Sequence, residues 1–475
     1  MDDEDIEPGE RTVCHGCVSE AFLSNEIAGH GSQARCYYCG ERRNTVVLDQ
    51  LAEWVEGALK RHFYRTSEEP DSYEAAMIAD RESDYNWDRH GEPVVDVIAS
   101  ALCVEQEIAE DIRTILEDRN YDQDLAAAGV ENPFDEEAHY SREKMTYPGM
   151  LHRWRQFEDG LHFKSRYFNS DLKAFLDRVF EGLPTLRTYE GTPVVVKAGF
   201  TENLARLYRA RTFYDADSLS VAICQPDREL GPPPANRASA GRMNAQGISV
   251  FYGATVKEAA LAEVRPPVGS RVLVAEFWIK KPLALLNLEA LATVREPGSI
   301  FDPHFLRRRE AEHFLRELET ILTVPVMPSQ EHLGYLTTQA VADYLANIVV
   351  PRVDGIIYPS VQVSGAKNVV LFHHAARVAA IERPKDAFVT ATLYRMEEHG
   401  PEPDYVVEEW EAEPIPSRPN RTGILGRPRQ APPDARESTL QIIPRTLEVH
   451  EVSSITIQSV SFPVRQRRTR APSVS

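Results

Sequence analysis

Two closely spaced cysteine pairs near the start of the chain constrain its first segment more than any other feature. Cys14 pairs with Cys17 and Cys36 with Cys39, with eighteen residues between the pairs. This spacing is close to that of sites where four thiolates surround one zinc ion tetrahedrally. Four thiolates leave no open position for catalysis, so we expect a structural Zn²⁺ in a zinc-ribbon-like segment over residues 1–46. A redox dithiol and unligated cysteines are the alternatives.

The bulk composition indicates a soluble globular protein of several domains. A chain of 475 residues exceeds what one hydrophobic core usually organises, so two or three domains are expected. The formal charge of -20 argues against general nucleic-acid binding, which depends on clustered Lys and Arg. The start carries no secretory signal and no long apolar run follows, so a cytoplasmic location without membrane contact is expected. Isolated Cys103 and Cys224 also suit a reducing compartment.

A mainly helical domain is predicted over residues 47–190. Its first helix is indicated by apolar residues at intervals of three or four, which form one stripe: Leu48, Leu51, Val55, Leu59 and Phe63. Further helices are predicted over 94–117 and 171–180, and Ser170 is placed to cap the latter.

The pattern then changes to short apolar runs separated by turns, which predicts a mixed α+β domain over residues 191–400. Strands are predicted at 249–252, 271–278, 353–359 and 368–372, and helices at 256–264, 303–322 and 338–349. Residues 401–475 should hold a Pro-rich connection over 414–436, strands at 447–452 and 454–460 that form a terminal hairpin or an added sheet edge, and a basic tail at 465–470.

One strand, turn and helix in this domain can be placed in more detail. Thr255 and Glu258 have the spacing of a capping box, directly after the strand that contains Tyr252. This places Tyr252 at a strand end and Glu263 about two turns into the helix. A single Glu on a helix is ordinarily a solvated surface residue, so the spacing alone assigns it no role.

Five dispersed polar residues between Leu207 and Phe372 carry a family resemblance. Arg209 follows Leu207-Tyr208, and Arg242 lies within Gly241–Asn244. Tyr252 ends a predicted strand, and Glu263 follows it by eleven residues. Ser360 ends the segment 354–360. Over residues 201–378 their order and spacing resemble the RES domain family. The chain departs from that pattern at Met243, where an aromatic residue is common, and in a longer loop over 215–240.

The resemblance implies a fold like that of ADP-ribosyltransferases and cleavage of NAD⁺ at the bond between nicotinamide and ribose, by phosphorolysis or hydrolysis. Such cleavage builds positive charge on the ribose, which a carboxylate stabilises, and Glu263 is expected in that role. Arg209 and Arg242 offer planar donor forks for the pyrophosphate, and one of them could receive inorganic phosphate as a co-substrate. Arg209 and Tyr252 join Glu263 in the expected catalytic set.

The remaining expected contacts are to substrate. Tyr252 could stack on nicotinamide or ribose, Ser360 could bind the nicotinamide ribose or amide, and Asn368 could shape the same rim. Surface ion pairing for each Arg and core packing for Tyr252 are the alternative interpretations. His373 and His374, just beyond the last strand, are expected in ordinary surface or core positions.

The resemblance leaves several functions open. The leading expectation is a toxin or defence effector that depletes NAD⁺, with an antitoxin or regulatory protein as a partner and with homo-oligomers left open. The alternatives are ADP-ribosyl transfer to a macromolecule and a non-catalytic zinc-ribbon protein that binds nucleotides. Helical regions that precede RES domains are grouped with the HEPN superfamily, in which Arg155 and His162 would fit an RNase pair. We favour an accessory or oligomerisation domain, because Trp154 and Phe157 suit a packing surface.

Overall fold

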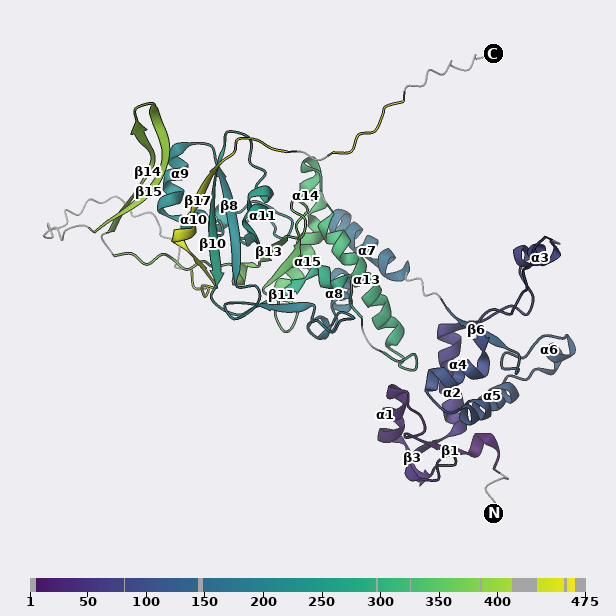
Figure 1. Ribbon diagram of the computed structural model, residues 1–475. Coiled ribbons are helices and arrows are strands. Elements are labelled where there is room, and N and C mark those ends of the chain that lie inside the picture. The colour runs from purple at the N-terminus through teal and green to yellow at the C-terminus, as the bar shows by residue number, and fades with distance from the viewer. Residues whose placement is uncertain are drawn as a thin grey trace, which may run out of the picture. The chain divides into compact units, whose positions relative to one another are not determined.

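The protein divides into two compact units, each described here by itself (Figure 1). The computed structural model describes residues 6–80, 82–143, 148–295, 298–324, 326–384, 387–411, 434–456 and 459–465. The first unit comprises Met1–Arg155 with Arg295–Phe314, and the second comprises Gln156–Val294 with Leu315–Ser475. Among the described residues, no helix combines the length and apolar character that crossing a bilayer requires.

The cysteine pairs lie in a small antiparallel sheet of the first unit. Strands β1 (Thr12–Cys14), β2 (Ser32–Arg35) and β3 (Arg42–Val47) pair in the order β1-β3-β2, and helix α1 (Ala21–His30) connects β1 to β2. The first cysteine pair therefore begins at the last residue of β1, and the second occupies the turn between β2 and β3.

Three amphipathic helices build the main core of this unit: α2 (Leu48–His62), α4 (Val94–Leu102) and α5 (Gln106–Arg119). The predicted stripe is confirmed for Leu48, Leu51, Val55 and Leu59, which are buried on α2. Its fifth residue, Phe63, lies beyond the helix, where it is half-buried and begins a strand. The single helix predicted over 94–117 is wrong. Cys103 adopts a left-handed conformation with φ 53°, which ends α4 before α5 begins.

Short strands that the sequence did not predict complete the first unit. They form an antiparallel sheet in the order β4 (Phe63–Arg65), β6 (His139–Arg142) and β5 (Glu92–Pro93), and the small helices α3 (Ser72–Ala79) and α6 (Gln123–Ala127) lie in the connections. Helices α7 (Pro148–Asp159) and α13 (Phe305–Thr323) each contribute residues to both units.

The region that contains Arg155 and His162 is helical, as predicted. Helix α7 continues into a π-helical turn, Gly160–Lys164, which precedes α8 (Ser170–Val179). Trp154 and Phe157 are buried, with Trp154 tilted against Phe314 at a ring-centre distance of 5.3 Å, so the packing role expected for both is confirmed. The predicted cap at Ser170 is wrong, because Asn169 accepts from the first N–H groups of α8.

The second unit is organised by one large sheet with strand order β16-β10-β8-β9-β13-β12-β11-β7, and β17 also pairs with β10. The mixed α+β class is confirmed, and the predicted strands at 271–278, 353–359 and 368–372 are present within a few residues. The strands of this sheet are β7 (Val195–Ala198), β8 (Arg206–Phe213), β9 (Phe251–Ala254), β10 (Arg271–Ile279), β11 (Leu283–Asn287), β12 (Gly355–Pro359), β13 (Lys367–Leu371), β16 (Leu440–Ile442) and β17 (Glu448–Glu451).

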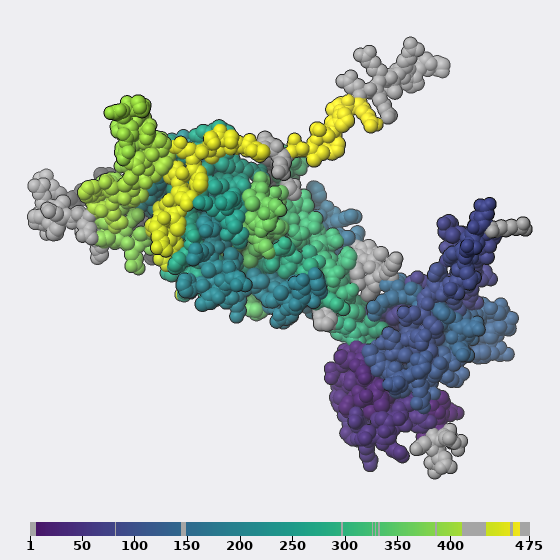
Figure 2. Space-filling model, viewed as in Figure 1, coloured from purple at the N-terminus to yellow at the C-terminus, as the bar shows by residue number. Residues whose placement is uncertain are grey.

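Helices cover both faces of this sheet. Helix α11 (Lys257–Glu263) packs Ala259 and Ala260 against one face, and α9 (Ala216–Cys224) packs Leu219 and Ile223 against the other. The hairpin of β14 (Ala387–Glu397) and β15 (Gly400–Glu411) lies beside α9 and forms the light green projection in Figure 2. The other helices of the second unit are α10 (Pro226–Glu229), α12 (Leu288–Leu291), α14 (Glu331–Gly334) and α15 (Leu336–Asn347).

Several local predictions need correction. The capping box at Thr255 is wrong, because its hydroxyl bonds to the backbone of Lys367 and Val256 precedes α11 without a side-chain cap. The segment 215–240 is not one loop, since it contains α9 and α10. Strand β17 is an added edge on β10, as expected, but the described residues of 454–460 form no strand. Most of 414–436 and of the tail at 465–470 lies outside the described residues.

Candidate functional site

A pocket of about 430 Å³ lies where strands β8 and β9 diverge. The two strands pair only at Tyr208 and Ala254. Tyr208–Ala210 of β8 and Tyr252–Ala254 of β9 line the pocket, together with residues of α11 and β13. Gly253 allows a close approach here, because a Cβ at this position would lie 2.9 Å from the Phe251 ring and 3.2 Å from the carbonyl oxygen of Tyr208. The diverging strands thus present side chains from both sides to one space.

Glu263 stands at the end of α11 with its carboxylate held by two polar side chains. Its Oε1 accepts a hydrogen bond of 2.8 Å from Asn368 Nδ2 and one of 3.1 Å from Ser360 Oγ. Ser360 and Asn368 are buried, whereas Glu263 is exposed. The carboxylate is therefore fixed at one edge while its second oxygen stays free of protein hydrogen bonds among the described residues.

The register of the sheet explains how distant residues meet at this carboxylate. Asn368 of β13 lies opposite Tyr358 of β12 on one side and Ala254 of β9 on the other. Ala254 in turn lies opposite Tyr208. Because side chains opposite each other in register share a face, Tyr358, Asn368 and Tyr208 form one polar row across the sheet. The small Ala254 in that row leaves room for the pocket.

Two buried polar atoms on the pocket wall have no hydrogen-bond partner among the described residues. They are Nη1 of Arg209, a donor, and Oδ1 of Asn368, an acceptor. Burial lowers the pKa of Arg209 to about 10, and the nearby Arg211 acts in the same direction, so Arg209 remains a cation at neutral pH. Its guanidinium lies 4.8 Å above the Phe251 ring. Leaving such groups unsatisfied is costly, so a ligand or an ordered water is the expected partner of both atoms.

Arg242 reaches the pocket from a turn, Gly241–Asn244, that helix α15 holds in place. Gln339 Nε2 donates 2.8 Å to the carbonyl of Gly241, and the hydroxyl of Thr338 donates to the carbonyl of Arg242. The Arg242 Nη1 donates to the carbonyls of Leu322 and Val324 at 2.8 and 2.9 Å. Both the backbone of this turn and the side chain of Arg242 are therefore held by residues about 80 to 100 positions away in sequence.

The hydroxyl of Tyr252 bonds within the protein. The hydroxyl donates 2.9 Å to Oδ1 of Asn244 and accepts 3.0 Å from the backbone N–H of Met243. Burial raises the pKa of Tyr252 to about 12. Its ring lines the pocket while its hydroxyl fastens the turn that carries Arg242. The close approach of the Tyr252 hydroxyl to this turn also requires glycine at position 241, because a Cβ added at Gly241 would lie 2.8 Å from that hydroxyl.

The structure brings together five of the six predicted substrate and catalytic residues as pocket-lining groups, and the sixth, Ser360, bonds to the lining Glu263. Sequence reasoning missed Tyr208, Tyr335 and Tyr358, which add aromatic surface to the wall. Tyr358 stands two residues before Ser360 on a predicted strand, so the period of two along a strand could have found it. Tyr208 is adjacent to Arg209, which that period places on the opposite face of β8, so it gave no such signal. Tyr335, which lies under the Arg242 guanidinium, gave no such signal.

A buried carboxylate next to Tyr208 was also missed. Glu276 of β10 is 7% exposed and accepts from Tyr208 at 3.2 Å and from Trp278 Nε1 at 2.7 Å. Arg206 lies 3.5 Å from the same carboxylate. This group holds the hydroxyl of Tyr208 and does not itself line the pocket. His374 pairs with Asp354 at 3.0 Å and does not line the pocket.

The four cysteines of the first unit have the geometry of a tetrahedral metal site. The sulfur atoms of Cys14 lie 3.7 Å from Cys17 and 3.6 Å from Cys39, and those of Cys17 and Cys36 are 3.8 Å apart. All four lie within 4.8 Å of one another. Ligands at a Zn–S distance of about 2.3 Å stand roughly 3.8 Å apart at the corners of a tetrahedron, so the thiols could hold a metal such as zinc.

The comparisons with known proteins identify the second unit's principal domain. A model of the RES domain family matches residues 206–393, so the chain contains a RES domain, as the resemblance over 201–378 predicted. No curated protein and no solved structure matches the chain. The similarity to HEPN regions, the zinc-ribbon assignment and the likeness to ADP-ribosyltransferases therefore stay predictions.

Proposed function

We propose that the RES domain cleaves NAD⁺ between nicotinamide and ribose, by phosphorolysis or hydrolysis. The main support is the carboxylate of Glu263, which a hydrogen bond from Asn368 fixes at the pocket. Two atoms of pocket-lining residues, the cationic donor Arg209 Nη1 and the acceptor Asn368 Oδ1, also have no partner within the described parts of the chain. A pocket of about 430 Å³ is within the usual range for ligand sites. NAD⁺ carries both an anionic pyrophosphate and several hydroxyl donors, so it can satisfy both atoms.

The chemistry requires one heterolytic bond cleavage and one new bond at the same carbon. The bond from ribose C1′ to the nicotinamide nitrogen breaks, and its electron pair leaves with nicotinamide, which becomes neutral. Glu263 stabilises the positive charge that develops on the ribose. An oxygen of water or inorganic phosphate then bonds to C1′. When water attacks, the free oxygen of Glu263 is the group placed to take its proton.

The remaining wall residues suit binding. Arg209 and Arg242 are the donors for the pyrophosphate or for an incoming phosphate, because their planar forks match phosphate oxygens. Asn368 Oδ1 accepts from a ribose hydroxyl or from the carboxamide. The ring of Tyr252 offers a surface for nicotinamide or ribose, and its hydroxyl serves the turn. Ser360 acts on the substrate through Glu263.

Depletion of NAD⁺ would stop the metabolism of a cell, so a growth-arresting toxin or defence effector is the biological role that the proposed reaction favours. A separate antitoxin or regulatory protein is the partner that such an activity would require. Growth of a host that expresses the wild type or the Glu263→Gln variant tests this role, since only the former should lower cellular NAD⁺ and arrest growth.

Nicotinamide release from NAD⁺ by the purified full chain tests the reaction. We expect release by the wild type and a loss of about 100-fold or more in Glu263→Gln, which keeps the shape and the accepting oxygen but removes the charge. Glu258→Gln is the matched control, because Glu258 is an exposed residue of the same helix outside the pocket. Phosphate-dependent release with a phosphorylated sugar product indicates phosphorolysis. If the wild type releases no nicotinamide either with or without inorganic phosphate, the proposal is overturned.

A further inference from the structure

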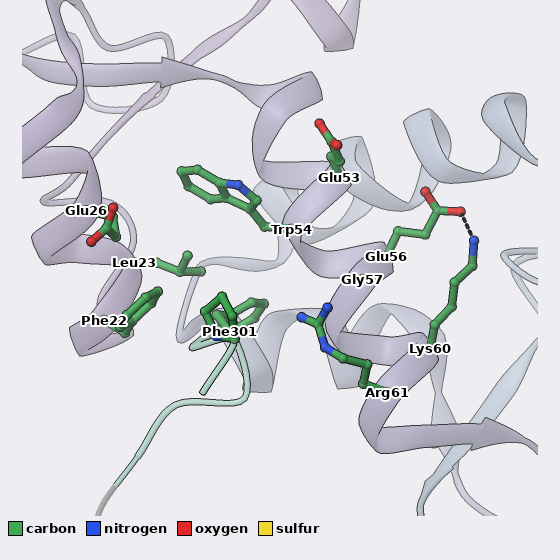
Figure 3. A pocket seen from close by; sticks show the side chains of 11 residues that line it. Phe22, Leu23, Glu26, Glu53, Trp54, Glu56, Gly57, Lys60, Arg61 and Phe301 are labelled. Carbon is green, nitrogen blue, oxygen red and sulfur yellow. Dashed lines mark hydrogen bonds and ion pairs between the residues drawn. The ribbon is translucent and has the colours of Figure 1, made fainter. Parts of the chain in front are cut away.

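A second pocket, of about 510 Å³, lies wholly within the first unit and takes no part in the proposed NAD⁺ chemistry. Phe22 and Leu23 of α1, Trp54 of α2 and Phe301 form its apolar wall. Figure 3 shows Trp54 and Phe301 bordering the space between α1 and α2. Phe22 and Trp54 remain half-buried although they pack on the core. The pocket thus offers aromatic surface on the scale of a small ligand.

Charged residues of opposite sign stand on the face of α2 that borders this pocket. Glu53, Gly57 and Arg61 follow at intervals of four residues, so they share one face of the helix. Neither Glu53 nor Arg61 has an ion-pair or hydrogen-bond partner among the described residues. By contrast, Glu56 is paired with Lys60 at 2.7 Å, as the dashed line in Figure 3 marks. Glu26, the third carboxylate of the wall, lies 3.2 Å from His30 of its own helix. Glu53 and Arg61 are therefore the charged groups of the wall that have no partner among the described residues.

Gly57 keeps the wall open between these two charges. A glycine inside a helix costs about 1 kcal/mol relative to alanine, so its presence calls for a reason. Internal packing does not supply one, because a Cβ there would first meet Arg61 Nη1 at 3.5 Å, which is ordinary contact. The same distance shows that Arg61 folds back toward Gly57. Its guanidinium consequently lies about one helical turn, roughly 6 Å along the helix, from the level of Glu53.

We propose that this pocket binds a free α-amino acid with a large apolar side chain. The ammonium group would face Glu53, the carboxylate would face Arg61, and the side chain would lie against Phe22, Trp54 and Phe301. An α-amino acid carries its two charges on adjacent groups, which suits a carboxylate and a guanidinium separated by one turn. The inference is independent of the proposed NAD⁺ cleavage, since the two pockets share no residue.

Calorimetric titration of the full chain with three probes tests the proposal. L-phenylalanine carries both charges, L-phenylalaninamide lacks the carboxylate, and N-acetyl-L-phenylalanine lacks the ammonium group. We expect saturable binding of L-phenylalanine at one site per chain and about tenfold weaker binding of each derivative, the effect of one lost charge-assisted contact. Equal affinity for all three probes, or no binding of L-phenylalanine, overturns the proposal.

Variants assign each charge to its partner. Arg61→Gln should weaken L-phenylalanine binding and abolish the difference between L-phenylalanine and its amide, and Glu53→Gln should abolish the difference from the N-acetyl derivative. Both residues are exposed, so neither change should alter the fold. Glu107→Gln, at an exposed site on α5 outside the pocket, is the control and should bind all probes as the wild type does. Unchanged L-phenylalanine affinity in both pocket variants overturns the assignment.

A third variant tests the opening at Gly57. Gly57→Leu raises helix propensity and places a side chain toward the pocket. It should remove L-phenylalanine binding while the circular dichroism spectrum stays as in the wild type and the thermal unfolding temperature does not fall. Binding retained by a folded Gly57→Leu protein contradicts the proposed location. If this variant fails to fold, the two charge variants decide the question.

Discussion

Asn368 Nδ2 donates a 2.8 Å hydrogen bond to the Glu263 oxygen that also accepts from Ser360. Asn368 thereby links the carboxylate on α11 to a buried position in β13, while its own Oδ1 has no hydrogen-bond partner in the described residues. The side chain both orients the proposed catalytic group and offers a contact to substrate. This double role distinguishes it from Ser360, whose hydroxyl also accepts long bonds from the backbone of Gln362 and Val363.

Asn368→Ala should therefore reduce NAD⁺ cleavage more than Ser360→Ala does. We expect kcat to fall about tenfold or more with Asn368→Ala, because Glu263 loses its shorter restraint, and KM to rise because the acceptor is lost. Ser360→Ala should lower kcat with little change in KM. Steady-state nicotinamide release measures both constants, with Asn347→Ala at the exposed end of α15 as the control. A larger loss in Ser360→Ala than in Asn368→Ala would contradict this division of roles.

Tyr252→Phe should destabilise the protein by about 1–3 kcal/mol, because Asn244 Oδ1 loses a donor and the Met243 N–H loses its acceptor. The pKa of Tyr252 is raised to about 12 from an ordinary value near 10. The contribution of the protonated Tyr252 hydroxyl to the free energy of unfolding is thus complete below about pH 10. It falls as pH rises toward about 12, because Tyr252 loses its proton at a lower pH in the unfolded chain than in the folded protein.

Chemical denaturation of the wild type and of Tyr252→Phe, from pH 8 upward to about pH 12, measures this contribution. The difference in unfolding free energy between wild type and Tyr252→Phe should narrow above about pH 10. Comparison with Tyr189→Phe, an exposed tyrosine outside the pocket, controls for the general effect of tyrosine ionisation. A difference that is independent of pH would show that the Tyr252 hydroxyl does not titrate as the geometry requires.

Thr338 and Gln339 are positioning residues for Arg242, since they donate to the carbonyls of Arg242 and Gly241. We expect Thr338→Val and Gln339→Leu to raise KM for NAD⁺ about five- to tenfold and to change kcat less, because the proposed role of Arg242 is binding. A double-mutant cycle with Arg242→Ala separates this role from a structural one. Once Arg242 is absent, neither change should add a further effect on KM. Additive effects would contradict the positioning role.

The order of elements around the site could be predicted because each strand and helix carries its own apolar pattern. The strand with Asn368, the strand that leads to Ser360 and the helix with Glu263 were all predicted within a few residues. Their family spacing then identified the polar residues. What the pattern could not supply was the register that places Asn368 opposite Ala254, because pairing depends on contacts between distant strands.

The errors have the same physical origin. Thr255 has the local spacing of a cap, yet its hydroxyl bonds to the backbone of Lys367, so a tertiary contact overrides the local one. Similarly, the apolar pattern over 94–117 is continuous, whereas the chain reverses at Cys103 through a left-handed residue. The support of Arg242 by α15 was not predicted, because no local pattern links positions nearly 100 residues apart.

Loss of the proposed zinc should unfold the cysteine segment without removing the RES domain's activity. We expect one zinc per chain by elemental analysis, and its loss in Cys36→Ser, because Cys36 is buried among the four sulfur atoms. Cys103→Ser is the control, since Cys103 is an exposed cysteine outside the cluster. In Cys36→Ser, limited proteolysis should cut residues 6–47 first, while nicotinamide release is retained, because the proposed active site lies in the other unit. If wild-type protein stripped of zinc resists proteolysis as well as zinc-loaded wild type does, the metal has no structural role.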